Sequence, residues 1–149
     1  MFALLTIDGT KRRVSLKKLY RLVYNKEYCK DNIIDLKGEQ WKYIEFTDKM
    51  YMISSCGRVK SFFGYEAMLL KPYHTKEWYQ RIDIVEEGQR KSKLIHRLVA
   101  AAFLPLPENI DMQLHHKDFN KSNNAAENLE WLTPAAHKRI HMQRKDSIK

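Results

Sequence analysis

The segment from residue 113 to residue 141 constrains the fold of this chain more than any other, because it holds four of the six histidines in one short pattern. Residues 113–117 have the composition of a strand, and residues 118–124 form a loop rich in Asp, Asn and Ser, whose side chains bond to nearby backbone. Residues 128–132 predict a returning strand. Thr133 is a typical helix N-cap, and a proline follows at the first helical position. The pattern therefore predicts a strand, loop, strand, helix unit.

Such a unit can bring strand histidines next to the first turns of its helix. His137 and His141 lie one turn apart on the same helix face. His115 and His116 are strand neighbours, whose side chains point to opposite faces, so both can serve one site only if the strand ends or bulges there. Neutral imidazole binds divalent metals, a metal polarises a phosphoryl oxygen, and a second imidazole can activate water. We therefore predict one metal site. A finger-like zinc site on His137 and His141 is the alternative, but no cysteine pair accompanies them.

At these residues the sequence resembles the HNH endonucleases, in particular the homing type of phages and introns. The matching positions are HHKDFNKSNN at 115–124, NLEW at 128–131, and His137. His116 precedes Asn128 by twelve positions, and Asn128 precedes His137 by nine. The resemblance implies a ββα-metal fold and cleavage of DNA.

The resemblance also implies roles for the residues of this segment. His116 is expected to be the general base that activates water. Asn128 is expected to complete the catalytic machinery by ordering the loop between the strands. Asp118 and Asn120 are expected to brace that loop.

The resemblance implies that His115 and His137 are the ligands of one divalent metal ion. Family members often carry a carboxylate or an Asn among these ligands, so two imidazoles make the site softer. Mg²⁺ or Mn²⁺ is the expected ion, and Zn²⁺ or Ni²⁺ can compete. The family often has Gly where Phe119 stands, and an aromatic ring there can stack on DNA or pack inward.

Residues 39–62 carry aromatic and β-branched residues around Asp48-Lys49 and Cys56-Gly57, which predicts a short antiparallel hairpin or meander. This stretch resembles the short modular DNA-binding motif found ahead of the nuclease domain in many homing enzymes. The residues that carry this resemblance are Glu39, Trp41, Ile53, Ser54, Gly57, Arg58, Val59 and Ser61.

Two further helices are expected. The first follows a strand at residues 2–7 and a turn at Asp8-Gly9, and runs from an N-cap at Ser15 to about Tyr24 with a basic outer side. It can lie along a phosphate backbone or be an ordinary solvated helix. The second follows a strand at 79–85 and a turn at Glu87-Gly88. Its expected N-cap is Ser92, and Leu104-Pro105 ends it.

These elements together predict an α+β fold, in which small antiparallel hairpins accompany helices and the ββα-metal unit is C-terminal. We expect an unassigned arm with a strand, a turn and a basic helix at residues 1–36. The modular DNA-binding motif is expected at 39–70, and the nuclease domain at 72–149.

The formal charge of +9 favours a polyanionic partner, although many basic domains bind no nucleic acid. With the resemblance, it predicts double-stranded DNA as the partner. No apolar run approaches the length of a membrane span, so we expect no membrane partner. The candidate DNA contacts are Arg58, Lys60, His96, Arg97, Lys121 and Lys138.

The resemblance implies a metal-dependent DNA endonuclease. A single site cleaves one strand, so nicking is expected unless two protomers face each other; the pattern does not decide between monomer and homodimer. The cytoplasm of a bacterial host is the expected location, with a phage as one source of the gene. Two alternatives stay open: an inactive DNA-binding regulator on the same fold, and a zinc-stabilised interaction module. The sequence leaves open the target site and the biological role.

Overall fold

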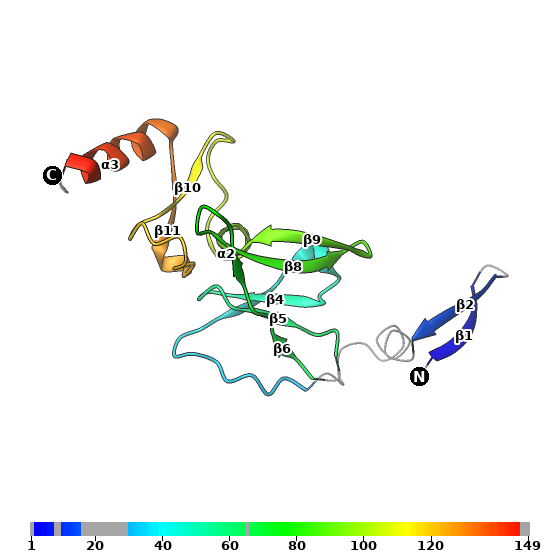
Figure 1. Ribbon diagram of the computed structural model, residues 1–149. Helices are drawn as coiled ribbons and strands as arrows, with labels where there is room; N and C mark the ends of the chain where they lie inside the picture. The colour runs from blue at the N-terminus through cyan, green and yellow to red at the C-terminus, as the bar shows by residue number, and fades with distance from the viewer. Residues whose placement is uncertain (1, 8–9, 16–29, 65, 147–149) are drawn as a thin grey trace.

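The computed structural model describes residues 2–7, 10–15, 30–64 and 66–146 (Figure 1). At the N-terminus, β1 (Phe2–Ile7) pairs with β2 (Thr10–Ser15) in an antiparallel hairpin. The strand predicted at residues 2–7 is therefore present. Ser15 is the last residue of β2 rather than a helix cap, and the rest of the helix predicted to Tyr24 lies outside the described residues.

The segment predicted as a hairpin or meander forms an antiparallel sheet. Its strands, in their order across the sheet, are β3 (Trp41–Tyr43), β4 (Tyr51–Ser54), β5 (Val59–Ser61) and β6 (Met68–Leu69). A 3-10 helix, η1 (Glu45–Thr47), lies between β3 and β4. Left-handed φ values at Asp48, Lys49 and Gly57 form the turns at both predicted positions. The meander is therefore confirmed.

A further antiparallel sheet contains β7 (Tyr73–His74), β8 (Gln80–Glu86) and β9 (Gln89–Leu94), and β9 runs directly into helix α2 (Ile95–Phe103). The prediction of Ser92 as the N-cap of this helix is wrong. Ser92 pairs with Asp83 inside the ladder, and pairing continues as far as Leu94. Backbone hydrogen bonding to β8 therefore outcompetes a local side-chain cap, and the helix starts three residues later, at Ile95.

The predicted strand, loop, strand, helix unit is confirmed, and it lies at the end of the molecule farthest from β1 and β2 in Figure 1. Its elements are β10 (Gln113–His116), the 3-10 helix η2 (Ala126–Asn128), β11 (Leu129–Leu132) and α3 (Pro134–Asp146). The Ala136 N–H donates to Thr133 Oγ1 at 3.3 Å, so Thr133 caps α3 as predicted. Asn128 ends η2 and so lies just before the second strand.

The buried core joins the two larger sheets to α2, which contacts β4, β8 and β9. Its most completely buried members are Ile53, Val59, Ile84, Ile95 and Val99. Leu129 of β11 belongs to the same core, so the C-terminal hairpin is anchored to the sheets by hydrophobic packing. Across the described residues, none of the helices is long and apolar enough to span a bilayer.

A second connection joins the turn after β4 to the loop between β10 and β11, which we call the site loop (residues 117–125). The Ala126 N–H donates to Ser55 O at 2.7 Å. A Cβ at Gly57 would lie 2.9 Å from Asn124 Cβ, closer than van der Waals contact allows, and the φ of Gly57 is +81°. Gly57 is therefore required both by its turn and by the close approach of the site loop.

Replacing Gly57 by Ala is expected to lower the free energy of unfolding by about 3 kcal/mol, because the added methyl group combines left-handed strain with overpacking. Gly88→Ala is the matched control, since Gly88 has φ +77° but an added methyl group there would meet no atom within 4 Å. It should cost only about 1 kcal/mol. Urea denaturation measures both values, and equal losses would show that the contact with the site loop contributes nothing.

Candidate functional site

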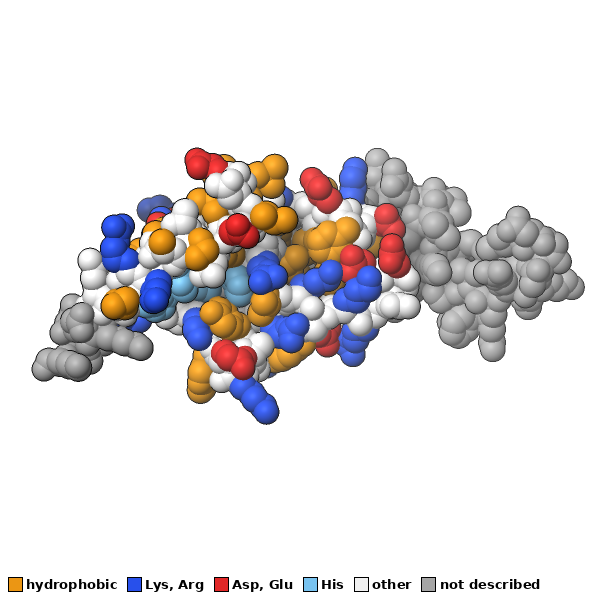
Figure 2. Space-filling model, turned by 90° about the horizontal axis from the view of Figure 1, so that it is seen from above, with side chains coloured by type: hydrophobic (Ala, Val, Ile, Leu, Met, Phe, Trp, Pro, Cys, Tyr) orange, Lys and Arg blue, Asp and Glu red, His pale blue; other side chains and the backbone are white. Residues whose placement is uncertain are grey.

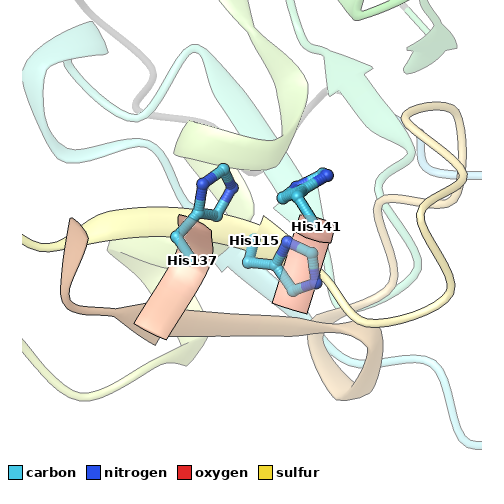
Figure 3. Close-up of side chains that lie close together, drawn as sticks. All are labelled: His115, His137 and His141. Carbon is cyan, nitrogen blue, oxygen red and sulfur yellow. The ribbon is translucent and has the colours of Figure 1, made fainter. Parts of the chain in front are cut away.

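Three histidines converge between β10 and α3 (Figure 3). One nitrogen atom from each of His115, His137 and His141 lies within 4.8 Å of those from the other two. The ring centroids of His137 and His141 are 4.5 Å apart, and both lie close to the ring of His115, at 5.2 and 5.4 Å. We call these residues the histidine cluster. The structure thus brings together His115 and His137, the two predicted ligands. It also adds His141, which was predicted to share a helix face with His137 but not to be a ligand.

The donor set of the histidine cluster fits a divalent metal ion. The pKa of His115 is lowered by its burial and then by the neighbouring charge of His137, so this imidazole stays neutral at neutral pH. Neutral imidazole is the form that binds metals. Three nitrogen donors match the transition metals better than they match Mg²⁺, which prefers oxygen ligands.

Phe119 forms one wall of the histidine cluster. Its ring packs edge-to-face on His115 at 5.0 Å and on His141 at 5.2 Å, and the Arg144 guanidinium lies 4.2 Å above it. Of the two orientations left open by the sequence, the ring therefore packs inward. Its φ of +61° is costly for an aromatic residue. The packing against two histidines offsets that cost.

His116 faces the opposite side of the β10–β11 hairpin. It pairs with Leu129 while His115 pairs with Glu130, and β10 ends at His116. Strand alternation turns its ring away from α3 and toward α2, where it lies 5.2 Å from the ring of His96. Because β10 ends at His116, which is the condition for a site shared with His115, the two neighbouring histidines lie in adjacent environments at the end of the hairpin, one on each of its faces.

Asn124 orients His116. Its Oδ1 lies 3.2 Å from His116 Nε2, and its Nδ2 donates to Gln80 Oε1 at 2.7 Å and to Ser122 O at 3.3 Å. Because the amide oxygen can only accept, Nε2 of His116 donates and Nδ1 carries the free lone pair. Asn124 is 2 % exposed, and sequence reasoning did not single it out although it closes the Asn-Asn pair of the motif.

The site loop is held by the residues predicted to hold it. Asp118 Oδ1 accepts hydrogen bonds from the Asn120 N–H at 2.8 Å and from Asn128 Nδ2 at 2.9 Å. Asn128 Nδ2 also donates to Asn123 O at 2.9 Å, and the Asp118 N–H donates back to Asn128 Oδ1 at 3.1 Å. Hydrogen bonds from Asn123 and Asn128 lower the pKa of Asp118, so it accepts them as a carboxylate. Asn128 therefore ties both ends of the loop together.

Two sequence profiles of known protein families match this chain. The sequence profile of the HNH endonucleases matches residues 93–139, and that of the NUMOD4 motif matches residues 39–85. The chain belongs to the HNH endonuclease family. Its NUMOD4 motif precedes the HNH domain, as the sequence resemblance implied.

Among the curated relatives of this HNH chain are two phage proteins. DNA endonuclease I-HmuI of Bacillus phage SP01 is 34% identical over 105 residues, which are 70% of this chain and 59% of that relative. H-N-H endonuclease F-TflII of Escherichia phage T5 is 32% identical over 69% of this chain and 52% of its own length. The chain therefore spans between half and six-tenths of the length of these two relatives.

A solved structure described as DNA binding and cleavage by the HNH homing endonuclease I-HmuI is also similar. The TM-score is 0.64 at 34% sequence identity, over 71% of this chain and 59% of that one. The mixed fold of antiparallel sheets and helices is therefore the fold of an HNH homing endonuclease.

Within the HNH domain, the prediction of His96 as a DNA contact is wrong. His96 is 6 % exposed, and its ring packs against the rings of both Tyr79 and His116. Burial, and then the charge of His116, lower its pKa to about 4. Its Nδ1 has no hydrogen-bond partner among the residues that the structure describes. A buried neutral ring is not a phosphate ligand, whereas the neighbouring Arg97 is exposed.

Two further candidate DNA contacts, Lys60 and Arg58 of the NUMOD4 motif, form ion pairs within the protein. Lys60 is 3 % exposed, and its ammonium group pairs with Asp31 at 2.9 Å and Asp35 at 3.2 Å. Arg58 Nε donates to Glu39 Oε1 at 2.8 Å. Burial alone would raise the pKa of Glu39, but hydrogen bonds from Arg58 and the backbone outweigh it and lower that pKa to about 2. Both cations are thus paired with carboxylates; Lys60 is buried as well, whereas the Arg58 side chain remains 25% exposed.

The remaining candidate contacts lie near the histidines. Lys138 follows His137 on α3 and is exposed. Lys121 in the site loop donates to Glu77 O at 3.0 Å, and its ammonium lies 4.5 Å from the Tyr79 ring centroid. Figure 2 shows histidine side chains at the surface with Lys and Arg side chains around them.

The low pKa of His96 makes the stability of the HNH chain sensitive to acid. The unfolded chain has the ordinary histidine pKa of 6.5, so it binds more protons than the folded chain, and stability is lost as pH falls from 6.5 toward 4. Between about pH 7 and about pH 5, this group should remove roughly 2 kcal/mol in the metal-free protein. His96→Gln should remove that part of the loss, and urea denaturation at both pH values measures it. His74→Gln is the exposed control. Parallel losses in all three proteins would contradict the assignment.

Proposed function

We propose that the chain is a metal-dependent DNA endonuclease that hydrolyses phosphodiester bonds with His116 as general base. The observation that carries the proposal is the pair of histidine environments on one strand: an oriented His116 on one face and a three-imidazole cluster on the other. The family membership and the names of the phage relatives support it.

His116 would accept a proton from water at Nδ1, because Nε2 is engaged with Asn124. The resulting hydroxide attacks phosphorus, the bond to one ester oxygen breaks, and that oxygen leaves in line with the attacking one. Asn128 and Asp118 act as positioning residues, since their hydrogen bonds keep His116 at the end of β10. A fixed base at the correct distance from phosphorus lowers the entropic part of the barrier.

His115, His137 and His141 would hold one divalent cation. When bound, that cation supplies Lewis-acid stabilisation of the charge that develops on the phosphate oxygens. The three nitrogen donors favour Mn²⁺, Ni²⁺ or Zn²⁺ over Mg²⁺. Phe119 shields one side of the cluster and so limits the approach of water to the donors.

Double-stranded DNA is the proposed substrate. Lys121, Lys138 and Arg97 are the proposed phosphate contacts, and the net charge of +9 favours association with a polyanion. One site of this kind cleaves one strand, so a monomer would nick and only two facing protomers would cut both strands. A bacterial cytoplasm is the proposed place of action, in keeping with the phage relatives.

The ligand set can be tested by titrating Ni²⁺ or Zn²⁺ into the metal-free protein by calorimetry. His115→Ala, His137→Ala and His141→Ala are each expected to weaken binding on the order of a hundredfold, because each removes one of three donors. His74→Ala is the control, since His74 lies outside the cluster. Unchanged affinity in His141→Ala would reduce the set to the two ligands that the sequence indicated.

Nuclease activity can be tested by conversion of supercoiled plasmid to open circle with Mg²⁺, Mn²⁺, Ni²⁺ or Zn²⁺. His116→Ala should slow conversion by about 10²- to 10⁴-fold while its Ni²⁺ affinity stays within about twofold, because the base is not a ligand. Plasmid binding by the wild type without conversion under any of these metals would instead support the inactive DNA-binding alternative.

A further inference from the structure

The turn between β7 and β8 presents a tryptophan beside the candidate site. Thr75 closes the turn: its N–H donates to Tyr79 O at 2.9 Å, its carbonyl accepts from the Trp78 N–H at 3.0 Å, and its Oγ1 accepts from the Tyr79 N–H at 3.2 Å. Trp78 lies at the tip with φ +66°, and it is 70 % exposed. The backbone of this residue is therefore fixed while most of its side chain faces solvent.

Neither backbone preference nor packing within the fold explains why a tryptophan stands at position 78. A left-handed φ favours glycine, and a bulky aromatic side chain at such a position is strained. An indole that remains 70 % exposed recovers little of that cost by burial. Its one aromatic contact is the exposed His74, at 5.6 Å between ring centroids, among the residues described. Strain retained without a packing gain is found where a residue serves binding or catalysis.

The turn is fastened to the site loop at two points. His74 Nε2 and Ser122 Oγ share a hydrogen bond of 3.1 Å, and Lys121 Nζ donates to Glu77 O at 3.0 Å. Tyr79, next to Trp78 in the chain, has its ring 6.1 Å from that of His116. The backbone that carries the indole is therefore held next to the proposed general base.

We propose that Trp78 stacks on a nucleobase of the DNA strand beside the phosphate that is cleaved. This proposal rests on the proposed nuclease function, because it takes DNA as the partner. Every base has a π-face, so one indole can stack without reading sequence. Lys76 in the same turn and Lys121 beside it are cations suited to the flanking phosphates. Because the turn is already rigid, stacking orders little additional backbone.

Stacking in a duplex requires that one base step open, so Trp78 would act as a wedge. Apolar and aromatic side chains that insert between base steps unstack and kink the duplex. Here the kink would present the backbone next to the opened step to His116. Trp78 is then a substrate-positioning residue whose loss weakens DNA binding without changing the metal site.

Trp78→Gly separates this role from folding, since glycine accepts the left-handed φ without strain. The metal-free variant is expected to unfold at the same or a higher urea concentration than the wild type and to bind Ni²⁺ equally well. Its Kd for a 40-base-pair duplex of random sequence should rise by about tenfold to a hundredfold. Trp78→Phe keeps a stacking ring and should lose less than Trp78→Gly. Phe46→Ala removes a half-exposed aromatic on η1 and should leave DNA binding unchanged.

The change in indole fluorescence on adding DNA is a second measurement, and a purely structural role of Trp78 would not alter it. The duplex should quench wild-type emission, and the quenched component should be missing in Trp78→Phe. Equal DNA affinity and an equal fluorescence response in Trp78→Gly and the wild type would overturn the proposal. So would loss of self-association in Trp78→Gly at unchanged DNA affinity, because the indole would then serve a second copy of this chain.

Plasmid nicking by the same variants distinguishes failure of the stacking proposal from failure of the nuclease proposal. If the wild type nicks plasmid and Trp78→Gly nicks with the same KM and kcat, stacking is wrong and the nuclease stands. If no metal supports nicking but duplex binding still depends on Trp78, the nuclease proposal is wrong, and of the stacking proposal only the contact between Trp78 and a base of the duplex stands.

Discussion

The arrangement of the site depends on the alternation of side chains along β10. His115 and His116 are consecutive, so the pairing of β10 with β11 sends one imidazole to each face of the hairpin. Each face is covered by a different helix: α3 contributes two histidines next to His115, and α2 packs His96 against His116. A shift of one residue in this register would exchange the two environments, so the hairpin register specifies which histidine can be a ligand and which a base.

The NUMOD4 motif supports the HNH domain rather than merely preceding it. Gly57 leaves the space that Asn124 occupies, and Ser55 accepts a hydrogen bond from Ala126 at the end of the site loop. Gln80, within the residues matched by the NUMOD4 profile, accepts from Asn124 and so fixes the amide that orients His116. The position of the candidate base thus depends on Asn124, which is held by segments more than forty residues before it in the chain.

The Lys and Arg side chains of this chain are not equally available for binding phosphate. Lys60 and Arg58 are paired with carboxylates on the segment before β3, so both cations stabilise the fold, and the buried Lys60 is not free for phosphate. The number of Lys and Arg residues in the sequence therefore overstates how many cations are available to bind phosphate. In the proposed function, it is the basic side chains beside the histidines and the exposed Trp78 that would face the DNA.

Local chemistry in the sequence determined the C-terminal unit, because alternation, loop-forming Asp and Asn residues, and the Thr133 cap act over a few neighbouring residues. The loop bonds of Asp118, Asn120 and Asn128 were expected from the family resemblance, and they join residues no more than ten positions apart. The roles of His141, Asn124 and His96, and the pairing of Lys60, were decided only by tertiary structure. Each depends on which distant segment covers the side chain: α3 against β10, Gln80 against Asn124, Tyr79 against His96, and Asp31 against Lys60. Burial and ion pairing between such segments arise from packing across the whole chain, and no local pattern encodes them.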